Sequence, residues 1–305
     1  MADKRVMFDF ELDFSNGGGI QGQGFRLDID GDDITDEALA AHIIGDMRLL
    51  MVSSVRILNK QIIVERHKRS SPTVPDSPRA SRRMLDLSHV IEEGMITYKG
   101  LPAPIICDYL SREASRGFYA PGTEFQIGQI TMCSNTGTYM DTPFHRYEDG
   151  ADLSCLPLEP ISNVPGIVVR VTGMEDRAID WTHFAASEVK GRAVLVHTGW
   201  DRNWRTDAYF EGHPFLTRAA AEYLRDQGAI LVGIDSFNID DVSGGERPVH
   251  STLLRAGIQI VEHMTGLSEL PHEGFRFFAV PPKVKGMGTF PVRAHAIIDA
   301  KADLT

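Results

Sequence analysis

The sequence has little cysteine, no long apolar run and fewer positive than negative charges. Its three cysteines include no CxxC pair, which argues against a disulfide framework and against a cysteine-based zinc site. No segment approaches the roughly 18–20 consecutive apolar residues that a membrane-spanning helix needs, and the first residues lack the apolar stretch of a signal peptide. We therefore expect a cytoplasmic protein with no membrane partner.

The charge balance also excludes a class of partner. The net charge is −11, from 31 Lys and Arg against 42 Asp and Glu. Nucleic-acid binding requires clustered positive charge that neutralises phosphates, so we expect no nucleic-acid partner. The 305 residues, 42% of them hydrophobic and 24% charged, are typical of a globular protein with one large or two unequal domains.

Residues 1–65 are predicted to form a small ββαβ accessory module. Apolar and acidic residues alternate over 7–14, and apolar and polar residues alternate again over 25–29, which is typical of two half-buried strands. Three glycines at 17–19 supply the turn between them. Thr35 is a candidate N-cap for a helix over 36–52, and residues 55–64 return to a strand-like composition.

The segment 66–83 separates this module from the rest of the chain. It holds three prolines, four serines and an excess of basic residues, with almost nothing apolar. Such a composition cannot bury a core, so it predicts a flexible linker. A basic run can also contact nucleic acid or a membrane surface, but beside an acidic body the linker is the favoured interpretation.

The remainder, 84–305, alternates strand-like and helix-like segments. Short apolar runs rich in β-branched residues at 167–171, 193–197 and 230–234 are typical of buried strands. The amphipathic segment 217–227, with Thr217 as a cap and Gly228 at its end, predicts a helix. The fold class is therefore mixed α/β with a largely buried sheet.

The residues that indicate chemistry lie in the segment NTGTYMDTPFH at 135–145. Asp141 and His145 flank a proline that fixes the backbone between them. Alone, this pair is weak evidence, because a carboxylate beside an imidazole is more often a structural hydrogen bond. His250 and Glu262 strengthen it, since Asp, His and Glu are ligands that zinc and manganese accept. His145 would then serve as the general acid and base.

These segments resemble the cyclase family, which includes bacterial kynurenine formamidase and has the hallmark HxGTHxDxPxH. The resemblance extends over 84–303 and includes further segments, at 86–89, 233–235, 250–254, 262–270 and 281–293. It implies a swivelling β/α domain around a mixed, barrel-like sheet, usually in homo-oligomers. It also implies hydrolysis of amides or lactones at one or two bound metal ions.

By the same resemblance, Asp141 is the bridging metal ligand, His250 and Glu262 complete the metal site, and His145 transfers protons. The chain departs from the hallmark at its first two histidines, which are metal ligands in the family and fall on Asn135 and Tyr139 here. A neutral tyrosine is a poor ligand. We therefore expect one divalent metal, zinc or manganese. Two alternatives stay open: Tyr139 acts without metal as an acid or oxyanion donor, or the domain is no longer an enzyme.

Four residues are candidates for binding the substrate. Asn135 and Tyr139 would contact it from the motif, and Trp200 and Phe237 would form an aromatic wall for a planar molecule, or else belong to the core.

The sequence thus predicts a metal-dependent hydrolase of a small amide, formamide or cyclic amide or lactone. The rival hypothesis is a non-catalytic binding or scaffold protein on the same fold. It would assemble through residues 1–65, because the core family does not need that module.

Overall fold

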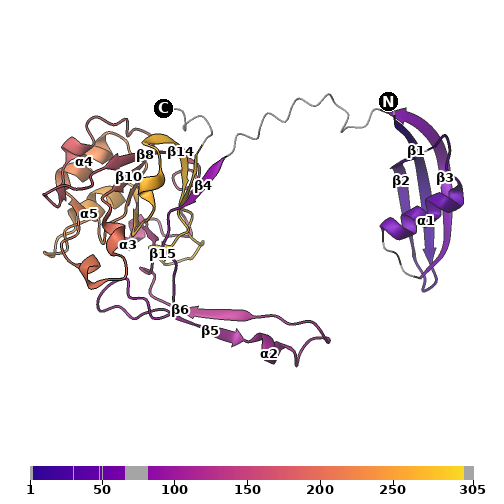
Figure 1. Cartoon of the computed structure of the whole chain (residues 1–305), viewed down its shortest axis with the longest axis horizontal. Coiled ribbons are helices and arrows are strands. Elements are labelled where there is room, and N and C mark those ends of the chain that lie inside the picture. The colour runs from indigo at the N-terminus through magenta and orange to yellow at the C-terminus, as the bar shows by residue number, and fades with distance from the viewer. Residues whose placement is uncertain (1–2, 30, 48, 50, 66–81, 299–305) are drawn as a thin grey trace. The chain divides into compact units, whose positions relative to one another are not determined.

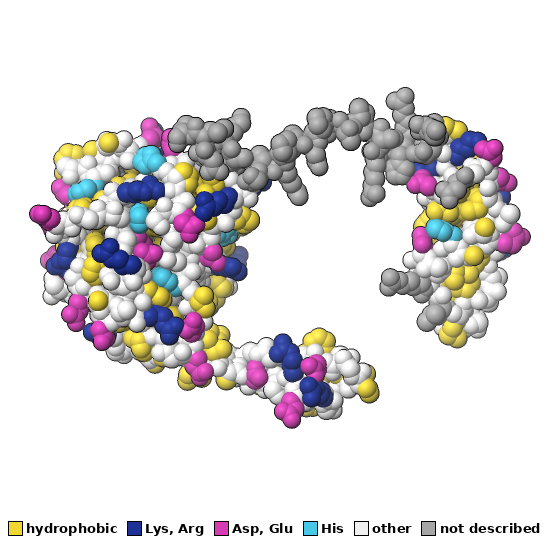
Figure 2. All heavy atoms as spheres, in the orientation of Figure 1, with side chains coloured by type: hydrophobic (Ala, Val, Ile, Leu, Met, Phe, Trp, Pro, Cys, Tyr) yellow, Lys and Arg dark blue, Asp and Glu magenta, His cyan; other side chains and the backbone are white. Residues whose placement is uncertain are grey.

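The computed structural model describes residues 3–29, 31–47, 49, 51–65 and 82–298. The chain divides into two compact units, Met1–Arg79 and Ala80–Thr305 (Figure 1). Most of the predicted linker lies outside the described residues, so its flexibility stays a prediction. Acidic and basic side chains are interspersed over the visible surface of each unit (Figure 2).

The N-terminal unit has the predicted ββαβ order. Its elements are β1 (Asp3–Phe14), β2 (Gly19–Asp28), α1 (Asp36–Asp46) and β3 (Val52–Glu65). The strands form an antiparallel sheet in the order β2-β1-β3. Alternate residues of β1, from Val6 to Leu12, are buried against Leu39 and Ile43 of α1. Because side chains alternate across a strand, this pattern could be predicted from the sequence.

The start of α1 was predicted correctly and its end was not. Thr35 Oγ1 accepts a hydrogen bond from Ala38 N at 3.2 Å, as expected of an N-cap. The helix ends at Asp46 rather than at residue 52. The apolar residues that follow belong partly to β3, because Val52 pairs with Phe14 of β1. Residue 52 is therefore part of a strand and not of the helix. This pairing with a distant strand cannot be predicted from the local sequence.

The C-terminal unit is built on a curled nine-stranded sheet in the order β15-β7-β13-β12-β10-β8-β14-β16-β4. The bounds are β4 Arg83–Asp86, β7 Tyr139–Asp141, β8 Val164–Arg170, β10 Ala193–His197, β12 Leu231–Ile234, β13 Gln259–Glu262, β14 Glu273–Phe278, β15 Thr289–Pro291 and β16 His295–Ile298. Strands β8, β10, β12 and β13 run parallel and the others antiparallel, so the sheet is mixed, as predicted.

The parallel strands at the centre of this sheet are buried on both faces. Along β10, Val194 and Val196 belong to one apolar cluster, and Ala193 and Leu195 belong to the other. The first cluster includes residues of α4 (Arg218–Asp226) and α5 (Pro248–Arg255), and the second includes residues of β14 and β16. Burial on both sides explains why the parallel strands appear in the sequence as continuous apolar runs.

Shorter elements complete the unit. They are α3 (Pro143–Arg146), α2 (Arg112–Ser115), the strand pairs β9 (Ala178–Ile179) with β11 (Phe215–Leu216) and β5 (Ile105–Leu110) with β6 (Ile127–Thr131), and the 3₁₀ turns Trp181–His183, Trp200–Asn203, Asp207–Phe210 and Leu267–Glu269. The β5–β6 hairpin projects from the rest of its unit (Figure 1). In the described part of the chain, no helix is long and apolar enough to cross a membrane.

Candidate metal centre and active site

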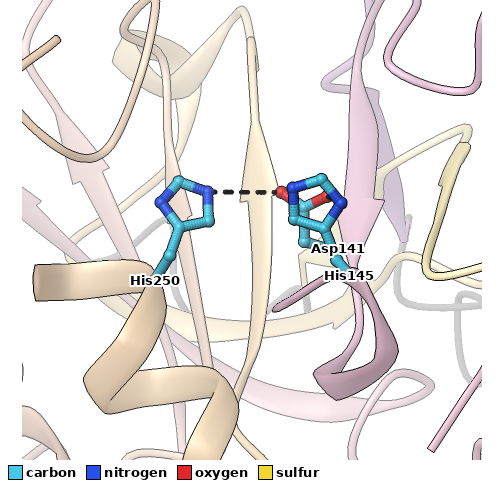
Figure 3. Close-up of side chains that lie close together, drawn as sticks. All are labelled: Asp141, His145 and His250. Carbon is cyan, nitrogen blue, oxygen red and sulfur yellow. Dashed lines mark ion pairs between the residues drawn. The ribbon is translucent and has the colours of Figure 1, made fainter. Parts of the chain in front are cut away.

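The four candidate chemical residues meet beside the neighbouring strands β7 and β13 of the sheet. Asp141 ends β7 and Glu262 ends β13, and these strands are antiparallel neighbours in which Glu262 pairs with Tyr139. His145 lies on α3, and His250 lies on α5. Figure 3 shows His250 reaching from α5 toward the Asp141 carboxylate. Residues more than 100 positions apart in the sequence thus form one cluster.

The first half of this cluster, which we call the acidic side, consists of Asp141, His250, Asp240 and the Oε1 atom of Glu262. His250 Nε2 lies 3.6 Å from Asp141 Oδ2 and 3.8 Å from Glu262 Oε1. Asp141 is fully buried, and its Oδ2 atom has no hydrogen-bond partner in the structure. A buried carboxylate oxygen needs a partner. Two carboxylate oxygens thus lie within 4 Å of one imidazole nitrogen, and all three are ligand types that a divalent zinc or manganese ion accepts.

Asp240 holds the His250 ring in the orientation that a metal ligand requires. Its Oδ2 lies 2.6 Å from His250 Nδ1, and its carboxylate also accepts hydrogen bonds from the backbone N–H groups of Val249 and His250. With Nδ1 donating to Asp240, the Nε2 atom is directed toward Asp141 and Glu262. A carboxylate on the far nitrogen is the usual support of a metal-binding histidine.

Electrostatics on this side also favours a bound cation. Burial alone would lower the pKa of His250, but the carboxylates of Glu262, Asp141 and Asp240 raise that pKa to about 10. Burial, with the neighbouring Asp141 carboxylate, raises the pKa of Glu262 to about 7. Three carboxylates around one imidazole therefore leave excess negative charge in a buried place. A divalent ion would neutralise it and displace the His250 proton.

His145 is positioned by a different route. Thr289 Oγ1 donates to Asp141 Oδ1 at 2.5 Å and lies 2.8 Å from His145 Nδ1. Because the single Thr289 proton goes to the carboxylate, His145 Nδ1 must donate to the hydroxyl oxygen. This chain of hydrogen bonds leaves His145 Nε2 free to accept a proton. Nitrogen and oxygen atoms of Asp141, His145 and His250 also lie within 4.8 Å of one another, so these three form a candidate metal group as well.

The second half of the cluster, which we call the phenolic side, surrounds Glu262 Oε2. Tyr139 OH donates to this atom at 2.7 Å, and the Tyr98 hydroxyl lies 3.1 Å from Tyr139 OH. Asn238 Nδ2 donates to Tyr98 OH at 2.7 Å. Burial first, and then the Glu262 charge, raise the pKa of both phenols well above 10, so they stay neutral. Tyr139 thus places a hydroxyl, not an imidazole, against Glu262.

A cavity of about 290 Å³ opens onto both sides. Its lining consists of Tyr98, Leu101, Asn135, Tyr139, His145, Arg146, Asn238, Val242, Arg247, His250 and Glu262. Asn135 and Tyr139 therefore both line this cavity, and their role in binding the substrate stays a prediction. The structure does not bring the other two candidates to this cavity: Trp200 Nε1 donates to Tyr209 O, and Phe237 packs behind Tyr98 with ring centroids 4.7 Å apart.

Sequence reasoning missed several residues of the site. Asp240 and Thr289 orient the two histidines, and Tyr98 supports Tyr139. Thr289 lies 148 positions from Asp141; it falls within the family-like segment 281–293, but nothing in that segment singles out this threonine. Asp240 had a weak signal, because it follows shortly after the buried strand β12, where parallel sheets place functional residues.

Comparison with known proteins identifies the family of the chain. The family model described as "Putative cyclase" matches residues 85–241, just over half of the chain. The chain therefore belongs to the cyclase family.

Its relatives include enzymes. A kynurenine formamidase of Geobacillus thermodenitrificans is 32% identical over 55% of this chain and 78% of its own length. A kynurenine formamidase of Delftia acidovorans is 26% identical over 70% of this chain and 97% of its own length.

Solved structures share the fold. A structure described as a potential metal-dependent hydrolase with cyclase activity is 27% identical and has a TM-score of 0.59, covering 71% of this chain and 98% of that one. An isatin hydrolase bound to thioisatinate has a TM-score of 0.63 at 20% identity over 73% of this chain and 94% of its own. At that identity it supports the fold alone. Together they confirm the predicted cyclase-type α/β architecture.

Proposed function

We propose that this chain is a hydrolase of a small amide, formamide or cyclic amide or lactone that uses one divalent metal ion. Membership of a family whose relatives are kynurenine formamidases makes it a hydrolase of non-peptide carbon–nitrogen bonds rather than a scaffold. The observation that supports a bound metal ion is the buried Asp141 Oδ2, which has no hydrogen-bond partner and lies 3.6 Å from His250 Nε2.

Asp141, His250 and Glu262 would hold the ion, with zinc and manganese as the candidates. Such an ion supplies Lewis acidity, which polarises a carbonyl oxygen and makes water more acidic. A single ion is supported by the phenolic side: Tyr139 OH donates to Glu262 Oε2, so that oxygen and the space beside it are already taken.

His145 would transfer the protons of the reaction. Its Nε2 accepts a proton from the attacking water and returns it to the leaving nitrogen or oxygen, so that no net charge accumulates on the leaving group. The hydrogen bonds through Thr289 to Asp141 keep its Nδ1 protonated throughout. Tyr139 and Asn135 line the same cavity and would bind the substrate there.

The decisive measurement is metal content per chain by elemental mass spectrometry, together with formamide hydrolysis. We expect about one zinc or manganese in the wild type. Asp141→Asn keeps an acceptor for Thr289 but removes the ligand oxygen, so it should lose both metal and activity. The control is Asp149→Asn, an exposed carboxylate paired with Arg255, which should keep both. Absence of metal from wild type incubated with zinc and manganese would contradict the proposal.

We also propose a cytoplasmic location, from the low cysteine content, and a homo-oligomer, from the family resemblance. The β5–β6 hairpin supports the second point. It is a two-stranded sheet, which is rarely stable uncovered, and it exposes Tyr109 (75%) and, in the connection between its strands, Phe118 (77%). A second copy of the chain would cover these side chains. Sedimentation velocity should show an oligomer that Tyr109→Glu/Phe118→Glu dissociates, and a monomeric wild type would contradict this.

A further inference from the structure

Two arginines share the cavity with the candidate catalytic residues. Arg146 directly follows His145 on α3, and Arg247 is the N-cap residue of α5, three positions before His250. Both guanidinium-bearing residues line the 290 Å³ cavity and also a hollow next to it. The cavity lining thus combines one carboxylate, that of Glu262, with two histidines and two positively charged arginines.

These two arginines differ from those around them. Arg218 pairs with Glu246 at 3.3 Å and Arg255 with Asp149 at 3.2 Å, in keeping with the interspersed charges of Figure 2. Within the described ranges, Arg146 and Arg247 have no carboxylate partner. A cation that lines a cavity and has no counter-ion favours an anionic ligand.

Both side chains are held in place without using up their charge. Arg146 lies over the Tyr147 ring at 5.4 Å, and its Nε donates to Ser251 Oγ at 3.3 Å. Arg247 NH1 donates to three backbone carbonyls, those of residues 241, 244 and 246. Neutral partners fix each guanidinium and leave its other N–H groups available, and a guanidinium fork suits a carboxylate.

We propose that Arg146 and Arg247 form an anion subsite that binds a carboxylate of the substrate. The substrate class is then a small amide, formamide or lactone that also carries a carboxylate, with an apolar body against Leu101 and Val242. The proposal rests on the proposed hydrolase function. The acidic side repels a carboxylate. The arginines would therefore bind that group, and the reacting carbonyl would lie toward the acidic side.

The first test compares two substrates that differ in one group, N-formylanthranilate and formanilide. The wild type should have a lower KM for the carboxylate-bearing substrate. In Arg146→Gln this KM advantage should shrink at least about tenfold, the loss expected for one charge-assisted contact. The matched control is Arg255→Gln, which removes the other guanidinium that lies over Tyr147 but does not line the cavity. It should keep the KM advantage.

The second test needs no turnover, so it separates this inference from the hydrolase function. Benzoate and benzamide are titrated calorimetrically into the metal-free protein at low salt. Benzoate should bind more tightly than benzamide, and Arg146→Gln/Arg247→Gln should abolish the difference. Equal binding of the two probes to the wild type, or an undiminished preference in the double variant, would overturn the subsite. Failure of both formamides to react, with benzoate still preferred, would count against the hydrolase alone.

Discussion

The acidic side and the phenolic side of Glu262 shift the pKa of a nearby histidine in opposite directions. On the acidic side, neighbouring carboxylates raise the pKa of His250 to about 10 despite its burial. Behind the phenolic side, His263 packs 5.1 Å from the Tyr139 ring, and burial holds its pKa well below 6.5. Without a metal ion, the surroundings thus favour the charged imidazole at His250 and the neutral one at His263. The difference lies in the partners, since both residues are buried.

The contrast shows how one carboxylate can serve two environments. Glu262 Oε1 accepts from Ile239 N at 2.6 Å and faces His250, whereas Oε2 accepts from the Tyr139 hydroxyl. A metal ion fits the first environment and a neutral hydrogen-bond donor occupies the second. The following predictions test whether the chemistry belongs to the acidic side alone.

The largest effect is expected at His145. In His145→Gln, kcat for formamide hydrolysis should fall about 10²–10⁴-fold, because the proton acceptor is lost. Metal content, measured by elemental mass spectrometry, should not change, because Asp141, His250 and Glu262 remain. If the variant lost the metal together with activity, His145 would be a metal ligand rather than only a proton acceptor.

Asp240→Asn should have the next largest effect. The amide cannot anchor the His250 ring as a carboxylate does, so metal affinity should fall about 10–100-fold. Competition with a chelator of known affinity measures this. Asp241→Asn is the control, because Asp241 is next in the chain and its carboxylate accepts hydrogen bonds from Ser243 alone among the described residues. Equal metal affinity in the two variants would show that Asp240 does not support metal binding.

Tyr139→Phe should act on stability more than on the metal. It leaves Glu262 Oε2 without its donor in a buried place, which should lower the free energy of unfolding by about 1–3 kcal/mol. Urea denaturation of the metal-loaded protein measures the change, and metal content should stay that of the wild type. Loss of the metal in this variant would mean that the two sides are not separate.

The smallest effect concerns His89, which stacks on Trp204 with ring centroids 4.0 Å apart. Burial lowers its pKa from 6.5 to about 4. The unfolded chain therefore takes up this proton at higher pH than the folded one, so acidification from about pH 6.5 to 4 should reduce stability. The loss attributable to His89 is at most about 3 kcal/mol.

This pH dependence can be isolated by comparing wild type with His89→Phe, which keeps a ring against Trp204 and cannot titrate. As pH falls through this window, the unfolding free energy of wild type should decrease more than that of His89→Phe. A constant difference would show that His89 takes up its proton equally in both states.

Local sequence was sufficient for several elements and for the core of the site. The alternation over 7–14 specified β1, the apolar run 193–197 matched β10, and Thr217 Oγ1 caps α4 through Ala220 N. The motif at 135–145, with His250 and Glu262, contains the four residues that the structure brings together beside β7 and β13. These signals succeed because side-chain periodicity, helix capping and ligand chemistry are properties of short segments.

The sequence by itself therefore determined the α/β class, the candidate acidic ligands, and the presence of Asn135 and Tyr139 where the family resemblance predicts histidines. Only the tertiary structure decided what replaces them. Pairing of β7 with β13 sets Tyr139 opposite Glu262, and the fold brings Tyr98, Asp240 and Thr289 to the same atoms. Such contacts join residues far apart in the chain, and a local sequence pattern cannot predict which distant residues will be in contact.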